Sequence, residues 1–178
     1  MGENYNGILS CDGWASYPKC VKLMQRCWAH LLGEAKWFAE KHESQARILY
    51  NELCRIFNRI SKVVVGTARN VITRTYNWSM KNMKAIIARC KAYAELRKFA
   101  YKIGNGLEYW FTCVLHPEIE PTNNRAERVL REIVEQRKIS SLWNEKGVRI
   151  KKTIMSCLAI WRLRGLNTLS MLRQTLSS

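Results

Sequence analysis

Hydrophobic and polar positions follow two different periods along this chain, and the change between them predicts its elements. Residues 7–11 form a short apolar run that stops at Asp12-Gly13, and residues 21–28 alternate roughly between apolar and polar positions. Both patterns are typical of strands. A turn and a short helix in the residues between them would complete a small parallel β-α-β unit.

Beyond residue 30, apolar residues recur every three or four positions, which predicts helices. Ser44 is a candidate cap for a helix with the apolar face Leu49, Leu53, Ile56, Phe57 and Ile60. A second helix is predicted to begin at Ser79 and to end near Gly104, while residues 61–78 receive no assignment. The remaining predicted helices cover residues 107–115, 122–139, 146–163 and 167–176. For 146–163 the predicted core face is Ile150, Ile154, Cys157, Leu158 and Trp161.

The net charge of the chain indicates its partner, whereas its length and composition indicate only a globular protein. The chain has 178 residues, 47% of them hydrophobic, which is enough for a globular core. Its 30 Lys and Arg against 14 Asp and Glu give a net charge of +16, so a polyanion is the expected partner. DNA is the first candidate, and a basic surface that is merely solvated is the simpler alternative. A membrane-surface protein is disfavoured because no helix combines a Lys-rich face with an aromatic rim.

The cysteines and the first residues indicate the compartment. The 7 cysteines are odd in number and scattered, which is typical of reduced thiols in a cytosolic protein. Residues 1–10 show no signal-peptide pattern, and the longest apolar run is too short to span a bilayer. We therefore expect a cytoplasmic, nucleoid-associated protein with no membrane partner and no small-molecule substrate.

Two acidic residues stand out as candidate chemistry. Asp12 is the single aspartate of the chain and directly follows the first predicted strand, where parallel sheets bind ligands. An Asp-Gly turn is the structural alternative. Glu127 begins a helix that also carries Arg125, Arg128 and Arg131. Asn124 and Glu127 are spaced as a capping box, but arginines at a helix N-terminus oppose the helix dipole, which favours an anionic ligand there.

Cys27 and His30 form a C-x-x-H pair just after the second predicted strand. With Cys11 and Cys20 they offer the donor types of a zinc site, but no C-x-x-C pair accompanies them. A pair that packs against or supports the site is therefore the preferred interpretation. A series of basic residues near Trp143, including Arg137, Lys138, Arg149, Lys151 and Lys152, is interpreted as a surface that follows phosphates.

Several blocks, taken in order, resemble a known family. They are Asp12-Gly13-Trp14 with Tyr17, then Cys27-Trp28-Ala29-His30, then Asn123-Asn124-Arg125-Ala126-Glu127-Arg128, and finally Arg137-Lys138 with Gly147. This ordered set is similar to that of the insertion-sequence-sixty-six family of transposases. The resemblance spans nearly the whole chain.

The resemblance implies an RNase H-like core with a DDE triad and divalent metal, Mg²⁺ or Mn²⁺. Asp12 would be the second catalytic aspartate and Glu127 the catalytic glutamate, both as metal ligands. Cys27, His30, Asn123 and Asn124 would support the site. DNA would be bound by Arg125, Arg128, Arg131, Arg137, Lys138, Arg149, Lys151 and Lys152.

Together these observations predict a mainly α protein with a small parallel β-α-β remnant, a partial RNase H-like core with a large helical insertion. The expected parts are two core strands (1–30), the insertion (31–115) and a catalytic-Glu helix with basic helices (116–178). No other aspartate stands in for the first catalytic one, so we expect a truncated transposase that does not bind metal productively. The alternative is a non-catalytic helical module that binds nucleic acid or self-associates as a homo-oligomer.

Overall fold

The computed structural model describes residues 6–12, 21–41, 45–139 and 144–177. It is mainly helical, with a small two-stranded parallel sheet. The chain divides into two compact units, residues 1–127 and 128–178, and each is described by itself. In the part of the chain that the structure describes, no helix is long and apolar enough to cross a membrane.

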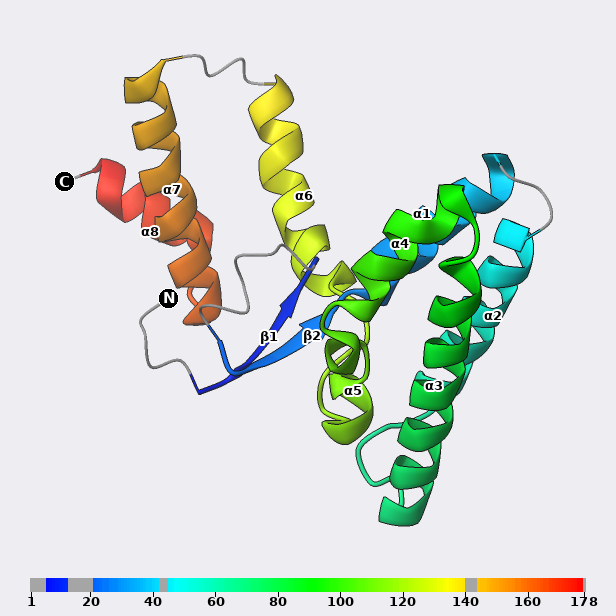
Figure 1. Ribbon diagram of the computed structural model, residues 1–178. Coiled ribbons are helices and arrows are strands. Elements are labelled where there is room, and N and C mark those ends of the chain that lie inside the picture. Colours follow the sequence, from blue (N-terminus) through cyan, green and yellow to red (C-terminus); the bar gives the residue numbers. More distant parts are fainter. Residues whose placement is uncertain (1–5, 13–20, 42–44, 140–143, 178) are drawn as a thin grey trace. The chain divides into compact units, whose positions relative to one another are not determined.

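The sheet consists of β1 (Ile8–Cys11) and β2 (Leu23–Arg26), which run parallel (Figure 1). In their register Ile8 pairs with Leu23 and Cys11 pairs with Arg26, so both strands end at the same edge. The prediction of two parallel strands is confirmed. The predicted turn and short helix between them fall mostly on residues 13–20, which lie outside the described residues.

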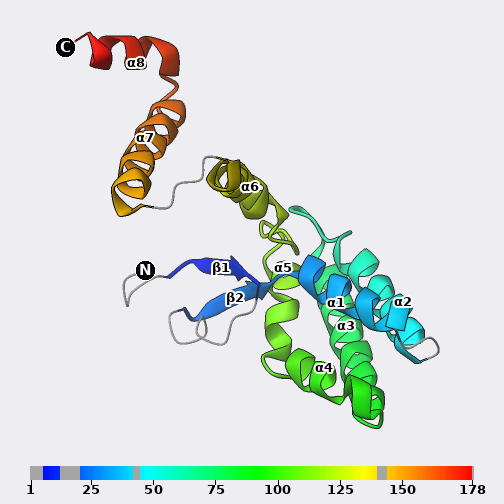
Figure 2. The ribbon, with the colours of Figure 1, turned by 90° about the horizontal axis from the view of Figure 1, so that it is seen from above.

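Four helices form the core of the first unit: α1 (Trp28–Lys41), α2 (Gln45–Ile60), α3 (Arg69–Cys90) and α4 (Ala94–Gly104). Each packs against the next in the chain, as Figure 2 shows from above. The predicted apolar face of α2 is confirmed, because Leu49, Leu53, Ile56 and Ile60 are buried and Phe57 packs against the same core.

The helix predicted from Ser79 to Gly104 is wrong at its start and in its continuity, whereas its predicted end is confirmed by α4, which ends at Gly104. The structure has one helix, α3, that begins ten residues earlier at Arg69, and a separate helix, α4. Ser79 is fully buried in the middle of α3 and does not cap it. Thr75 and Ser79 share the buried face with Met83 and Ile86. Because these two core positions are polar, the apolar period of the helix is hidden before residue 83.

Two short helices, η2 (Leu107–Trp110) and α5 (Thr112–Leu115), replace the single helix expected at 107–115 and join the helices to β2. The Thr112 hydroxyl donates to the Met24 carbonyl at 2.6 Å, and the Trp28 indole N–H donates to the Trp110 carbonyl at 2.6 Å. Such buried bonds fix the sheet edge relative to the helices, because each partner would otherwise remain unsatisfied.

Arg26, at the end of β2, is a buried cation in this junction. Its Nη1 donates to the carbonyls of Lys102 and Asn105, at 3.0 and 2.9 Å, and its guanidinium lies 4.2 Å from the Trp110 ring centroid. Burial lowers the pKa of the Arg26 guanidinium. The carbonyls at the end of α4 offset part of that cost, because they carry the negative end of the helix dipole.

Most of α6 (Asn124–Ile139), with α7 (Glu145–Leu163) and α8 (Thr168–Leu176), forms the second unit. The predicted cap at Asn167 is confirmed, because its side chain accepts from the Ser170 amide at 3.0 Å. The predicted core face of α7 is not buried: Ile150 is 52% and Ile154 is 48% exposed. The other three residues of the predicted face, Cys157, Leu158 and Trp161, are only partly buried, although an apolar stripe of a helix prefers burial.

Candidate carboxylate site and basic helices

The parallel strands bring two chemistry-bearing segments to the same edge. The Cys27 amide donates to the Cys11 carbonyl at 2.9 Å, one step beyond the last ladder pair. Asp12, which is partly buried, therefore follows β1 where Cys27 follows β2. This is the carboxyl edge of a parallel pair, where α/β sheets bind ligands.

The segment before α6 is tied to this edge by two hydrogen bonds. The Trp28 amide donates to the Pro121 carbonyl at 3.0 Å, and the Asn123 amide donates to the Cys27 Sγ at 3.1 Å. Cys27 is completely buried, so its sulfur acts here as an acceptor inside the protein. The beginning of α6 is thereby fixed beside the end of β2.

The first turn of α6 places Glu127 on that edge. The Glu127 amide donates to the Asn123 carbonyl at 3.1 Å, which makes Asn123 the N-cap residue and Asn124 the first helical residue. The alternative of an Asn124–Glu127 capping box is therefore wrong, because that motif needs the glutamate three residues after the cap. The Glu127 carboxylate is 3.6 Å from His30 Nε2, and the two side chains are 44% and 47% exposed.

Cys27, His30 and Glu127 form a group of metal-ligand types. Their Sγ, ring nitrogen and carboxylate oxygen all lie within 4.8 Å of one another. The zinc alternative from the sequence combined Cys27 and His30 with Cys11 and Cys20. Of these, Cys20 lies outside the described residues. The sequence indicated Cys27 with His30, but it carried no sign that Glu127 is their partner.

The donor types decide which metal suits which residues. Mg²⁺ prefers carboxylate and other oxygen ligands, and a thiolate suits zinc or other soft ions. By donor type, Asp12 and Glu127 therefore fit the magnesium that the resemblance implies, whereas Cys27 does not. The Asn123 amide already bonds to the Cys27 sulfur, which favours a supporting role for this residue.

Comparison with known families decides the identity. The model of the family described as "Transposase IS66 family" matches residues 1–150. The chain belongs to this family. The resemblance noted from the ordered sequence blocks is thereby confirmed. No significant match to a curated protein or to a solved structure was found.

In this IS66-family chain, the predicted DNA contacts lie on two helices. Arg125 is exposed in the first turn of α6, and Arg128 and Arg131 are exposed further along it. Arg137 and Lys138 belong to the same helix, but their side chains lie outside the described residues. On α7, Arg149 and Lys152 are exposed and Lys151 is partly buried.

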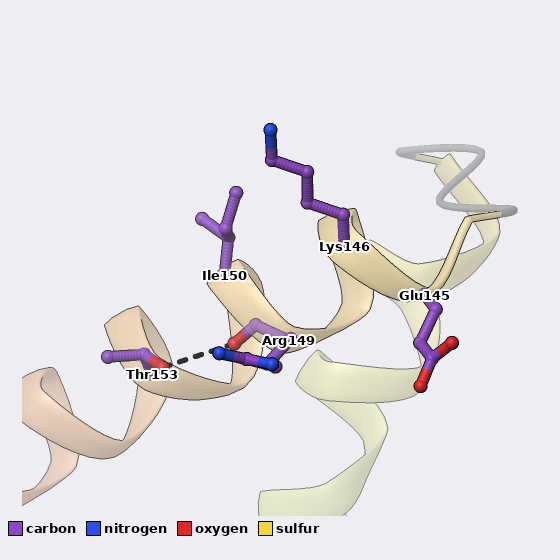
Figure 3. A pocket seen from close by; sticks show the side chains of 5 residues that line it. All are labelled: Glu145, Lys146, Arg149, Ile150 and Thr153. Atoms are coloured by element: carbon purple, nitrogen blue, oxygen red, sulfur yellow. Dashed lines mark hydrogen bonds between the residues drawn. The ribbon is translucent and has the colours of Figure 1, made fainter.

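A shallow hollow of about 570 Å³ opens along the first turns of α7. Lys146 and Arg149 contribute its positive charge and Glu145 its one negative charge. Figure 3 shows Lys146 and Ile150 projecting from the same side of α7, as their spacing of four requires. The hollow adds Lys146 to the basic residues of this helix that face solvent.

Proposed function

We propose that this chain carries part of a DNA strand-transfer site, built from Asp12 and Glu127 on a partial RNase H-like core. One observation carries the proposal. The segment that follows β1, the C-x-x-H pair and the catalytic-type glutamate of α6 converge on one edge of a parallel strand pair. Membership in a transposase family supplies the DNA substrate.

The reaction would be two in-line displacements at phosphorus. In the first, a water oxygen bonds to phosphorus, the bond to the 3′ oxygen breaks, and that oxygen leaves as a 3′-hydroxyl with a proton. In the second, this hydroxyl attacks a phosphodiester of another strand and releases a new 3′-hydroxyl. The number of P–O bonds is unchanged in each step. Asp12 and Glu127 would hold Mg²⁺, which supplies charge stabilisation for such displacements when bound.

The neighbours of Glu127 would position its carboxylate. His30 Nε2, at 3.6 Å, restricts where the carboxylate can point, and the Cys27–Asn123 bond holds the turn that carries it. Arg125, Arg128 and Arg131 extend along the same helix and would contact phosphates. Such arginines fix the register of DNA without reading its sequence.

The proposal is tested by mapping where a divalent ion binds, independently of activity. Fe²⁺ in place of Mg²⁺, with ascorbate and peroxide, cuts the polypeptide backbone beside the bound ion. We expect cuts near both residue 12 and residue 127, read by mass spectrometry. Asp12→Asn and Glu127→Gln should each abolish both cuts, whereas Glu95→Gln, at an exposed position on α4, should not. If Asp12→Asn and Glu127→Gln both behave like Glu95→Gln, the site is refuted.

One further variant separates the carboxylates from the thiol as metal ligands. If the carboxylates hold the ion, Cys27→Ser, which keeps an acceptor for the Asn123 amide but removes the thiolate, should retain the cuts. If Cys27→Ser abolishes them while Asp12→Asn does not, the ion belongs to the Cys27–His30–Glu127 group, and a zinc-type site replaces the proposal.

A second candidate function, self-association of a non-catalytic module, is favoured by a different observation. Ile150 and Ile154 are four residues apart on one side of α7, and each is about half exposed. Apolar stripes of this kind are typical of surfaces that pair with another protein. Light scattering over a range of protein concentrations should reveal a dimer or larger assembly if this candidate holds, and Ile150→Glu should return the chain to a monomer.

A further inference from the structure

Positive charge is concentrated on one helical hairpin of the first unit. Residues 53–94, called here the basic hairpin, contain nine Lys or Arg and no Asp or Glu. They include the second half of α2, the following loop and all of α3. Among the described residues, the only carboxylate ion pair in this stretch joins Arg89 to Glu52, next to its border. The other basic side chains therefore carry charge that no neighbouring carboxylate offsets.

A hollow of about 520 Å³ lies between α2 and α3 on this hairpin. We call it the basic hollow, and its polar lining is Arg55, Asn58, Arg59, Lys62, Thr75 and Trp78. The three cations are spaced four and three residues apart, so they share one face of α2 and its end. At 1.5 Å per residue the three cations extend over about 10 Å along the helix axis. They therefore form a row of positive charge.

Trp78 holds two of these cations in place. The Arg59 guanidinium lies 4.3 Å and the Arg55 guanidinium 5.5 Å from the Trp78 ring centroid. Trp78 itself packs against the hydrophobic core and is therefore a fixed platform. A guanidinium that stacks on a ring keeps its in-plane N–H groups free to donate to an anion. Two cations on one ring also repel each other, and a bound phosphate would relieve that repulsion.

The first turns of α3 add a second row of donors. Arg69, Asn70, Thr73, Arg74 and Asn77 are all exposed and line a shallow hollow of about 540 Å³. Arginine and asparagine side chains are common donors to DNA phosphates, whereas the Thr73 hydroxyl already donates to the Arg69 carbonyl. With the basic hollow, they give the hairpin two adjacent surfaces with the same chemistry.

We infer that the basic hairpin binds the phosphate backbone of duplex DNA without reading its sequence. The inference rests on DNA being the polymer of the proposed function, but it needs neither Asp12 nor Glu127. Arginines held on the Trp78 ring are positioned for phosphates and cannot extend to base edges. An acidic protein is the weaker candidate, because the one large aromatic side chain of the basic hollow is already covered by arginines.

The test compares two triple variants with the same charge. One is Arg55→Gln with Arg59→Gln and Lys62→Gln. The control, Arg47→Gln with Arg97→Gln and Lys98→Gln, changes exposed residues outside the basic hairpin. Binding to a duplex of random sequence is measured by fluorescence anisotropy over a range of salt. We expect the first variant to flatten the slope of log affinity against log salt by about two to three units and the control by less than about one. Equal slopes for the two variants would overturn the inference.

A second measurement uses the unaltered chain, so it does not depend on a variant that folds. Acetylation of lysines is followed by mass spectrometry with and without the duplex. We expect DNA to protect Lys62 and to leave Lys98 reactive. Protection of Lys62 by polyglutamate to the same extent as by DNA would also overturn the assignment.

The outcome is separable from that of the proposed function. If the unaltered chain shows no Fe²⁺ cuts but DNA still protects Lys62 from acetylation, only the carboxylate site is refuted. If the unaltered chain shows the Fe²⁺ cuts but DNA does not protect Lys62 from acetylation, only the DNA-binding surface on the basic hairpin is refuted.

Discussion

The amide of Asn123 donates a hydrogen bond to the sulfur of Cys27, 96 residues away in the chain, at 3.1 Å. Cys27 also bonds through its own amide to the Cys11 carbonyl. One buried residue therefore joins the end of β1 to the N-cap of the helix that carries Glu127. The position of Glu127 in the proposed site therefore depends on this connection.

Replacing Cys27 with Ala should loosen the start of α6. The partly buried Asn123 amide loses its acceptor, and we expect the free energy of unfolding to fall by about 1–2 kcal/mol. Hydrogen exchange of the Asn123 amide, read by NMR, should become faster. Cys27→Ser keeps an acceptor and should retain most of the protection. Equal exchange in all three proteins would contradict the supporting role of Cys27.

Gln25 should be as important for stability as a large core residue. Its completely buried side chain donates to the Arg26 carbonyl at 2.7 Å and accepts from the Cys113 amide at 2.7 Å. Gln25→Leu leaves that amide without a partner, so we expect a loss of about 1–3 kcal/mol in chemical denaturation. Gln45→Leu, at an exposed position, is the control and should change stability by less than about 0.5 kcal/mol.

The sequence predicted local elements well where one period dominates. The strands and α2 follow from alternation and from an unbroken apolar face. The boundaries of α3 were missed because Thr75 and Ser79 are polar at core positions, where a small hydroxyl permits close packing. Helix propensity and the apolar period of the sequence cannot by themselves distinguish a serine buried inside a helix from a serine that caps one.

The site was predictable in its parts but not in its connections. Asp12, Cys27, His30 and Glu127 each carried a local signal in the sequence. The bond between Asn123 and Cys27 and the approach of His30 to Glu127 are long-range contacts, which no spacing in the sequence encodes. The basic hairpin was missed for another reason: its charge is spread over two helices, and only their packing brings Arg55 and Arg59 onto Trp78.

Arg128 and Arg131 on α6 should each contribute one phosphate contact. Replacing both with Ala is expected to flatten the salt slope of DNA binding by about two units, because each contact releases close to one counterion. Anisotropy titrations over a range of salt measure this slope. Arg47→Ala with Arg97→Ala is the matched control on exposed positions of the first unit. A DNA affinity that does not change with salt concentration would contradict recognition of phosphates.

Stability should fall at alkaline pH through Cys113. Burial raises the pKa of the Cys113 thiol to about 12, above its ordinary value in an unfolded chain. The folded state therefore keeps the proton while the unfolded state releases it. The protonated Cys113 thiol makes its full contribution to the free energy of unfolding below about pH 8.5. That contribution is lost as the pH rises towards 12, at about 1.4 kcal/mol per pH unit. Cys113→Ala should show a shallower decline of unfolding free energy between about pH 8 and about pH 10. Parallel pH curves for the two proteins would contradict the shift.

The isolated chain should not nick DNA or transfer strands with Mg²⁺ or Mn²⁺. Asp12 is its single aspartate, so the proposed site holds two assigned carboxylates where a two-metal mechanism uses a cluster. Loss of one group from a concerted site commonly lowers the rate by several orders of magnitude, because the nucleophile is no longer positioned. Supercoiled plasmid and oligonucleotide substrates with transposon ends provide the assay. Cutting that Asp12→Ala or Glu127→Ala abolishes would mean that a further carboxylate completes the site, with Glu3 and Glu108 the first to be replaced.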